Sequence, residues 1–431
     1  MYRKVMRFLE DWKDSAHRKP LILQGARQVG KTYSVLEFGR THYENVAYFN
    51  FETNPKLNTA FEENISPDYL IPLLSHIAGQ TIVKEKTLIV LDEVQLCERA
   101  LTSLKYFCED APEYHIIVAG SLLGVAVNRA RFSFPVGKVD MKTLYPMDME
   151  EFMLALGEEE LVERVKECFR TNTPMPAVLH DAAMKLYRQY LVTGGMPECV
   201  MQYVQTKDHI LVRHTQDTIL ASYLNDMSKY NNLNEIKKTR LAYDNITVQL
   251  SKKNTRFQYK LIKKGGRASE FENAIEWLCL SGIVSQVHKA EQIKKPLENY
   301  RDIDAFKIYV SDLGLLCAKK DLAANDVLYM VEELNDFKGG MVENYVNVQL
   351  TTNGYSTYYW ESERGAEIDF IIQRAGELIP IEVKSADNTK AKSLKVYMDT
   401  YKPAYAIKLS AKNFGFEDNK KIVPLYAAFC I

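Results

Sequence analysis

The stretch Leu21-Ile22-Leu23-Gln24-Gly25-Ala26-Arg27-Gln28-Val29-Gly30-Lys31-Thr32 decides the fold of this chain. Its apolar start is typical of a buried strand, and residues 25–32 follow the pattern glycine, four residues, Gly-Lys-Thr. Gly25 and Gly30 let the backbone turn without a Cβ atom, so consecutive N–H groups and the start of a helix can surround a polyphosphate. The stretch predicts a strand, a phosphate-binding loop and a helix. The alternative is a glycine turn without a ligand.

Individual roles follow from this loop. Lys31 would reach the β- and γ-phosphates of a nucleotide, and the Thr32 hydroxyl would be a ligand of Mg²⁺. The other residues expected to line the nucleotide are Gly25, Ala26, Arg27, Gln28, Val29, Gly30 and Tyr33.

Length and charge set the broad class of protein. At 431 residues the chain is too long for one ordinary domain, so we expect two or three domains with separate cores. The 55 basic residues nearly balance 56 acidic ones, which argues against a protein that coats a polyanion and makes any nucleic-acid site regional. No stretch is apolar over roughly 18 residues, and charges are interspersed at the N-terminus. We therefore expect a cytoplasmic protein without a membrane span.

A second strand ends in two carboxylates. Residues 86–93, Lys-Thr-Leu-Ile-Val-Leu-Asp-Glu, contain four consecutive apolar residues, which suit a strand buried on both faces of a parallel sheet. Such strands place ligand sites at their carboxyl ends. The pattern resembles a Walker B motif, in which Asp92 would hold the hydration shell of Mg²⁺ and Glu93 would polarise the attacking water. Strands also end in solvated acids, but the position of this one after the glycine loop favours the Walker B interpretation.

A third apolar strand, residues 114–121, ends in Ser121. In AAA-type ATPases a polar residue at the end of the strand between those of the phosphate loop and the Walker B motif senses the γ-phosphate. Ser121 is the candidate for that sensor. The alternative is that Ser121 caps the helix that follows.

The motifs of the first 200 residues together resemble a large prokaryotic family, whose members join an AAA-type ATPase core to a C-terminal domain of unknown function. The motifs are residues 25–32, 91–95, 119–124, 144–152 and 193–198. The resemblance implies a P-loop NTPase fold with a parallel α/β sheet that binds ATP and Mg²⁺. A trans-acting arginine is expected in AAA rings. Arg129 and Arg131 are available, but nothing identifies either as this arginine, and a homo-oligomer is left open.

The pattern of helices and strands predicts four segments. Residues 1–150 form the P-loop AAA-type ATPase core, and residues 151–232, which show helical periodicity, form a helical lid. Residues 233–304 show two or three helices and then a strand hairpin, the order of a winged-helix-like segment. Residues 305–431 are predicted to form a restriction-endonuclease-like α/β domain, a prediction based on the acidic residues described below.

Residues 252–267 form a basic segment. Its seven charges are Lys252, Lys253, Arg256, Lys260, Lys263, Lys264 and Arg267, with Phe257 and Tyr259 between them. Such a cluster can neutralise phosphates and place a helix against a DNA duplex. The alternatives are a solvated basic face and a contact with an acidic neighbour, since winged helices also dock proteins.

The last third of the chain carries acids and a lysine on two adjacent strands. Side chains alternate along a strand, so Asp369 points to the polar side of one strand, while Glu382 and Lys384 share one face of the next. Together with Glu343 on a preceding helix, they resemble the core of the PD-(D/E)xK nucleases. The usual proline before the first acid is absent, because Ile368 precedes Asp369.

This second resemblance implies metal-dependent chemistry. Asp369 and Glu382 would ligate Mg²⁺, Glu343 would support the metal, and Lys384 would orient or activate the water that attacks a phosphodiester. Many domains on this scaffold bind nucleic acid without cleaving it. We therefore hold two hypotheses: an ATP-driven DNA-processing protein, and an ATP-gated switch that docks a protein partner through an inert nuclease-like domain.

Overall fold

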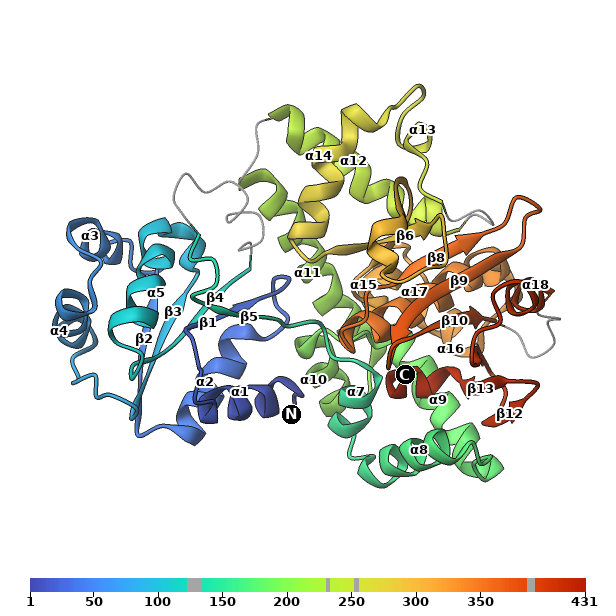
Figure 1. Cartoon of the computed structure of the whole chain (residues 1–431), viewed down its shortest axis with the longest axis horizontal. Coiled ribbons are helices and arrows are strands. Elements are labelled where there is room, and N and C mark those ends of the chain that lie inside the picture. Colours follow the sequence, from blue (N-terminus) through green and yellow to red (C-terminus); the bar gives the residue numbers. More distant parts are fainter. Residues whose placement is uncertain (122–133, 230–232, 252–255, 386–391) are drawn as a thin grey trace. The chain divides into compact units, whose positions relative to one another are not determined.

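The computed structural model describes residues 1–121, 134–229, 233–251, 256–385 and 392–431 (Figure 1). The chain divides into two compact units. The N-terminal unit contains residues 2–145 and 280–282, and the C-terminal unit contains residues 1, 146–279 and 283–431.

The N-terminal unit contains a parallel sheet with the strand order β2-β3-β4-β1-β5. The strands are β1 (Leu21–Gln24), β2 (Asn45–Asn50), β3 (Thr87–Asp92), β4 (His115–Gly120) and β5 (Asp140–Thr143). Every residue of β3 and β4 is buried, as their apolar sequences predict. Gln24 pairs with Gly120 and Asp92 with Ala119, so β1, β3 and β4 end together at one edge of the sheet.

Helices cover both faces of this sheet. They are α1 (Val5–Asp14), α2 (Lys31–His42), α3 (Leu57–Glu63), α4 (Pro67–Ala78) and α5 (Glu98–Asp110), with the short 3₁₀ turn η1 (Val94–Leu96). One face packs Ile89 and Leu91 into a single core with α3, α4 and α5. The alternating residues face α2, where a Cβ atom on Gly39 would lie 3.1 Å from the Leu88 side chain.

The C-terminal unit begins with a series of helices. They are α7 (Met149–Ala155), α8 (Glu159–Thr171), α9 (Ala177–Thr193), α10 (Pro197–Thr206), α11 (His209–Lys229), α12 (Leu233–Leu250), α13 (Tyr259–Ile262) and α14 (Ala268–Leu280). The region predicted as a lid is helical. Its helices belong to the same compact unit as the C-terminal sheet, not to the unit of the parallel sheet.

The rest of this unit is built on an eight-stranded mixed sheet with the order β12-β13-β11-β10-β9-β8-β6-β7. The strands are β6 (Val284–Ala290), β7 (Arg301–Val310), β8 (Tyr358–Glu361), β9 (Glu367–Arg374), β10 (Glu377–Val383), β11 (Ala406–Ser410), β12 (Gly415–Glu417) and β13 (Lys420–Pro424). The predicted hairpin is present as β6 and β7, but β6 also pairs with β8. The boundary predicted between residues 304 and 305 therefore falls inside β7, because hydrogen bonds join the hairpin to the C-terminal sheet.

Two helices lie against opposite faces of this sheet. The remaining helical elements are η2 (Leu297–Tyr300), α15 (Leu313–Lys319), α16 (Ala324–Tyr329), η3 (Glu332–Leu334), α17 (Asn335–Thr352), α18 (Lys392–Tyr401) and η4 (Leu425–Cys430). Leu394 and Tyr397 of α18 share a core with Trp360 and Ile368. The Asn344 amide of α17 donates to Val310 O (2.8 Å) and accepts from Val310 N (2.7 Å), which fixes the helix to β7.

A buried carboxylate joins the first helices of the C-terminal unit to the end of β7. Asp312 accepts hydrogen bonds from the backbone N–H groups of Gly195 (2.6 Å) and Leu315 (2.8 Å). Burial raises the pKa of Asp312 to about 6, and the N–H groups around the carboxylate act in the opposite direction. Gly195 is in close contact with the chain at Met147, where a Cβ atom would lie 1.9 Å from the carbonyl oxygen. Gly194 and Gly195 are thus packed between two other segments of the chain.

No helix in the described ranges is long and apolar enough to cross a membrane.

The close contact at Gly195 predicts a large loss of stability in Gly195→Ala. The added methyl group would overlap backbone atoms, which cannot rotate away as a side chain can, so we expect a loss of about 3 kcal/mol. The measurement is urea unfolding by fluorescence in a Trp12→Phe background, which leaves Trp277 and Trp360 of the C-terminal unit as reporters.

Gly339→Ala is the matched control for this prediction. Gly339 lies in α17, and nothing lies within 4 Å of its added Cβ atom, so the same change should stabilise the unit by about 0.5–1 kcal/mol. Equal unfolding midpoints for the two variants would contradict the packing of Gly195 described above.

Candidate functional site

The loop between β1 and α2 has the backbone that its glycines predict. Gly25 has φ +148°, and a Cβ atom there would lie 2.1 Å from Leu144 O; Gly30 has φ +90°. Gln28 also has a positive φ, of 65°. Arg3, which the sequence analysis did not identify, donates from its guanidinium to Val29 O (2.9 Å) and to Tyr145 O (2.8 Å). A buried arginine thus supports the loop from outside the motif.

Lys31 begins α2 and is 7% exposed. Its ammonium donates to two carbonyls of its own loop, Gly25 O (2.9 Å) and Ala26 O (2.7 Å). Burial lowers the pKa of Lys31 to about 8, against the opposing influence of the Glu93 and Asp92 carboxylates. The two loop carbonyls therefore hold the side chain, and burial leaves the charged form of Lys31 only weakly favoured over the neutral form.

Asp92, at the end of β3, connects the loop to the neighbouring strands. Asp92 Oδ2 accepts from the Thr32 hydroxyl and from the Tyr48 hydroxyl, both at 2.8 Å. Tyr48 lies on β2, and the sequence analysis did not assign it a role. Its position opposite Val90 of β3 becomes known only when the order of the strands is known.

Glu93 follows Asp92 with a φ of 52°, a left-handed conformation that non-glycine residues seldom adopt. The Gln95 amide donates a hydrogen bond to its carboxylate. Burial raises the pKa of Glu93, the Gln95 hydrogen bond lowers it, and the nearby Asp92 charge raises it further. A carboxylate with a raised pKa is suited to accept a proton.

Ser121 lies directly after β4, the strand between β1 and β3. Its side chain is buried, and its hydroxyl oxygen has no hydrogen-bond partner among the described residues. A buried hydroxyl without a partner is costly, which favours a role toward a ligand. The two candidate arginines, Arg129 and Arg131, lie outside the described residues, and so do residues 122–124 of the motif after Ser121.

The structure brings together most of the predicted nucleotide-site residues at one edge of the parallel sheet. The loop, Asp92, Glu93 and Ser121 follow the carboxyl ends of β1, β3 and β4. Ala26 and Val29 have buried side chains, so they can serve a ligand only through their backbone, and Tyr33 is 58% exposed. Thr32 Oγ1 and the Asp92 carboxylate supply oxygen ligands in contact with each other, which fits Mg²⁺.

The predicted C-terminal residues also meet on one face of a sheet. Ile381 pairs with Phe370, which places Glu382 opposite Asp369 on the next rung of the ladder. Asp369 Oδ2 accepts a hydrogen bond from Val383 N (2.7 Å), and the Lys384 ammonium forms an ion pair with Glu382. Glu343 of α17 lies close enough to influence the ionisation of Asp369, Glu382 and Lys384.

A lysine from β7 enters this group. Lys307 is 1% exposed, and its ammonium lies 3.5 Å from Glu343 Oε2 and forms an ion pair with Glu367. Tyr309, two residues along β7, donates from its hydroxyl to the same Glu343 oxygen (3.1 Å). Nothing in the sequence assigned Lys307 or Tyr309 a role in this site.

Burial and repulsion between carboxylates disfavour the charged form of two acids in this cluster, Asp369 and Glu382. Burial, followed by the charges of Glu343 and Glu382, raises the pKa of Asp369 well above its usual value. Burial also raises the pKa of Glu382, although Lys384 opposes that change. For Lys307, burial opposes the charged form, but Glu343, Glu367 and Asp369 outweigh it and raise the pKa.

These carboxylates do not fit a divalent metal ion as they are arranged. In the part of the chain that the structure describes, no group of three or more His, Cys, Asp or Glu side chains is placed to hold a metal. Of the predicted ligands, Glu343 already faces the ammonium of Lys307 and Glu382 that of Lys384, while Asp369 accepts from Val383 N.

The basic segment is partly described, since Lys252 and Lys253 lie outside the described residues. The described basic side chains, Arg256, Lys260, Lys263, Lys264 and Arg267, are exposed. The two aromatic residues between them face inward. Phe257 stacks on Phe306 of β7 at 5.4 Å between ring centroids, with Tyr259 edge-on at 5.2 Å from Phe257. They anchor the segment to β7 and are not placed to stack on bases.

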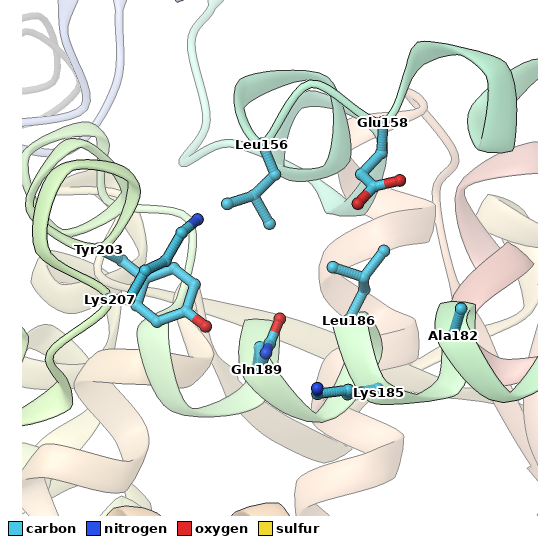
Figure 2. Close-up of a pocket in the computed structure, with 8 residues that line it drawn as sticks. All are labelled: Leu156, Glu158, Ala182, Lys185, Leu186, Gln189, Tyr203 and Lys207. Carbon is cyan, nitrogen blue, oxygen red and sulfur yellow. The ribbon is translucent and has the colours of Figure 1, made fainter.

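A separate pocket of about 270 Å³ lies among the helices of the C-terminal unit. Its lining comes from the α7–α8 connection, α9 and α10, and Leu156 points from that connection toward α9 (Figure 2). None of the residues that the sequence analysis singled out lines it.

Three family models match successive parts of the chain. Residues 17–153 match an AAA domain, which supports an AAA-type ATP-binding domain with a P-loop, as the motifs predict. Residues 184–326 match "Domain of unknown function (DUF8612)", and residues 338–428 match "Domain of unknown function (DUF4143)". No match was found among curated proteins.

Three solved structures that are similar to this chain are compared with it in turn. The Walker-type ATPase PABY2304 of Pyrococcus abyssi is 13% identical to this chain. The match covers 73% of this chain and 94% of the Pyrococcus protein, with a TM-score of 0.44. The ORC2 protein of Aeropyrum pernix is 14% identical, and the match covers 78% of this chain and 93% of ORC2, with a TM-score of 0.34. RuvB of Thermotoga maritima, in a variant with one substitution, is 14% identical, and the match covers 65% of this chain and 88% of RuvB, with a TM-score of 0.30. These low TM-scores establish neither an activity nor a partner for this chain.

The lowered pKa of Lys31 predicts that ATP affinity depends on pH. Above pH 8 the free protein carries a neutral Lys31, whereas bound phosphates favour the ammonium, so binding must take up a proton. We expect Kd to rise by up to about tenfold per pH unit above pH 8 and to be nearly constant between pH 7 and 8. Titration of a fluorescent ATP analogue from pH 7 to 9.5 measures this. A Lys31→Gln variant should bind weakly at every pH, and a flat wild-type profile would contradict the prediction.

Proposed function

We propose that this protein is a Mg²⁺-dependent ATPase whose nucleotide cycle is coupled to DNA binding by the C-terminal unit. The observation that carries the ATPase is the contact between Thr32 and Asp92. It joins the helix that begins at Lys31 to the strand that ends at Asp92, which supports a site for phosphate and Mg²⁺ at this edge of the sheet.

Each residue has a distinct task in ATP hydrolysis. The N–H groups of the loop bind the phosphates, and the Lys31 ammonium exchanges the Gly25 and Ala26 carbonyls for phosphate oxygens. Mg²⁺, when bound by Thr32 and Asp92, supplies neutralisation of phosphate charge. Glu93 orients a water and accepts its proton as the water oxygen bonds to the γ-phosphorus and the bond to the ADP oxygen breaks.

Two substitutions separate ATP binding from hydrolysis. Lys31→Ala should abolish nucleotide binding or turnover, because the loop loses the ammonium that would reach the β- and γ-phosphates. Glu93→Gln should retain ATP binding and lose turnover by roughly 10²–10⁴-fold, because the amide cannot accept the proton. Binding is measured by calorimetry and turnover by phosphate release.

Glu62→Gln, an exposed change on α3, is the control for the Glu93 variant. Normal turnover in Glu93→Gln would remove this residue from the mechanism and leave the assignment of the water-activating group open to Ser121 or Gln95.

The exposed basic side chains of residues 256–267 support the DNA-binding part of the proposal. Phe257 N donates to Phe306 O at 2.8 Å, so the segment is tied to β7. Its basic side chains are exposed, and Lys263 pairs with Glu270 at 3.1 Å. Three helices, α12 to α14, precede the β6–β7 hairpin, an order that also supports the winged-helix-like interpretation. The pairing of β6 with β8 is a departure from an independent winged helix.

Charge reversal tests the DNA contact. Lys260→Glu combined with Lys264→Glu should weaken binding to duplex DNA about equally for all sequences and lower the salt slope by roughly 2, about one for each lost phosphate contact. Fluorescence anisotropy at several salt concentrations measures both effects, and ATPase assays with DNA measure the coupling.

Lys56→Glu combined with Lys105→Glu, two exposed lysines of the N-terminal unit, is the matched control. If the wild-type protein does not bind DNA and DNA does not change its ATPase activity, the results support the alternative function. In that alternative the protein is an ATP-gated switch that docks a protein partner, with a catalytically inert nuclease-like domain.

A further inference from the structure

The acidic cluster of the C-terminal unit contains a cation that belongs to the chain. Lys307 reaches it from β7, the edge strand of the sheet, and its ammonium faces Glu343 of α17 and Glu367 of β9. It is among the most deeply buried charged groups of the protein, at 1% exposure. Burial of a lysine is stable only when anionic partners surround the ammonium.

The surroundings of Lys307 hold it in this position. The ring of Tyr359 lies 5.1 Å from its ammonium, and the Tyr309 hydroxyl is bonded to the same Glu343 oxygen that faces Lys307. On the outer side, Arg256 forms a β-bridge with Lys307. Phe257 N bonds to Phe306 O, so this part of the strand is covered.

Two ammonium groups already lie among the four acids of the cluster. The acids are Glu343, Glu367, Asp369 and Glu382, and the cations are Lys307 and Lys384. Lys384 belongs to the metal-binding pattern itself, but a divalent ion placed among these acids would also lie next to the Lys307 ammonium, and like charges at contact distance inside a protein repel strongly. Displacing Lys307 instead would leave a buried ammonium without partners.

We propose that Lys307 takes the place of a divalent metal ion, so that the cluster is metal-free and does not cleave phosphodiesters. The C-terminal sheet is then a binding scaffold without a catalytic metal ion. This inference does not rest on the proposed ATPase, because every group in it belongs to the C-terminal unit.

Manganese titration of the native cluster is the first test. The protein carries Asp92→Asn to suppress metal binding at the nucleotide site, and the EPR signal of free Mn²⁺ reports how much is bound. We expect no Mn²⁺ at the cluster at millimolar concentrations. Mn²⁺ binding that disappears when Asp369→Asn is added would overturn the proposal, as would Mn²⁺-dependent DNA cleavage that disappears with the same change.

Removal of the lysine is the second test. Lys307→Met keeps most of the side-chain volume, removes the charge and exposes a vacant set of acids that includes Glu382 Oε2, a buried oxygen without a hydrogen-bond partner among the described residues. In the Asp92→Asn background we expect Mn²⁺ affinity to rise at least tenfold and the gain to be lost when Asp369→Asn is added.

Lys319→Met is the matched control, since Lys319 also pairs with a carboxylate, Asp244, and lies 3.8 Å from the ring of Tyr243. A folded Lys307→Met protein with unchanged Mn²⁺ affinity would overturn the proposal. If Lys307→Met does not fold, the titration of the native cluster decides by itself.

Discussion

Burial of carboxylates is the constraint on which both units depend, because a carboxylate away from water is stable only when donors or cations face it. The chain meets this condition in three ways. Hydroxyl groups of Thr32 and Tyr48 face Asp92, backbone N–H groups face Asp312, and lysine ammonium groups face the acids of the C-terminal cluster. The kind of group that faces the carboxylate differs between the candidate metal site at Asp92 and the C-terminal cluster. Hydroxyls can release a carboxylate to a metal ion at little cost, whereas a buried lysine cannot.

The same carboxylates also determine how the backbone packs. Asp312 draws the N–H of Gly195 to 2.6 Å, and Met147 N donates to Gly195 O at the same distance. Contacts this close need residues without side chains, which explains why glycines stand at positions 194, 195 and 314. A polar interaction and a steric requirement therefore act together to connect the first helices of the C-terminal unit with the end of its hairpin.

Local patterns predicted what is local in this structure. The strand, loop and helix at residues 21–32 are confirmed, and so is the parallel α/β core, because glycine spacing and buried apolar runs depend on neighbouring residues alone. Residues 57–78 contain two helices, with Pro67 at the first position of the second. The lid, winged-helix and nuclease interpretations stay predictions.

What the sequence could not show depends on contacts between distant segments. A hairpin signal does not say which sheet the hairpin joins, so the pairing of β6 with β8 was not foreseen. Arg3, Tyr48 and Lys307 act on residues 26, 44 and 36 positions away, respectively, and no periodicity links them to their partners. Phe257 and Tyr259 lie among the basic residues that predict a DNA contact, and only the structure shows that their rings pack together and onto Phe306 of β7.

The Asn344 side chain has a consequence for how the protein can associate. By bonding to both the N–H and the C=O of Val310, its amide group imitates the backbone of a neighbouring strand at the edge of the sheet. Residues 256 and 257 occupy the same edge at Lys307 and Phe306. An exposed edge strand is a template for recruiting foreign strands and for aggregation. Along this stretch of β7 the template is already taken, so partners that add a strand to a sheet must attach elsewhere.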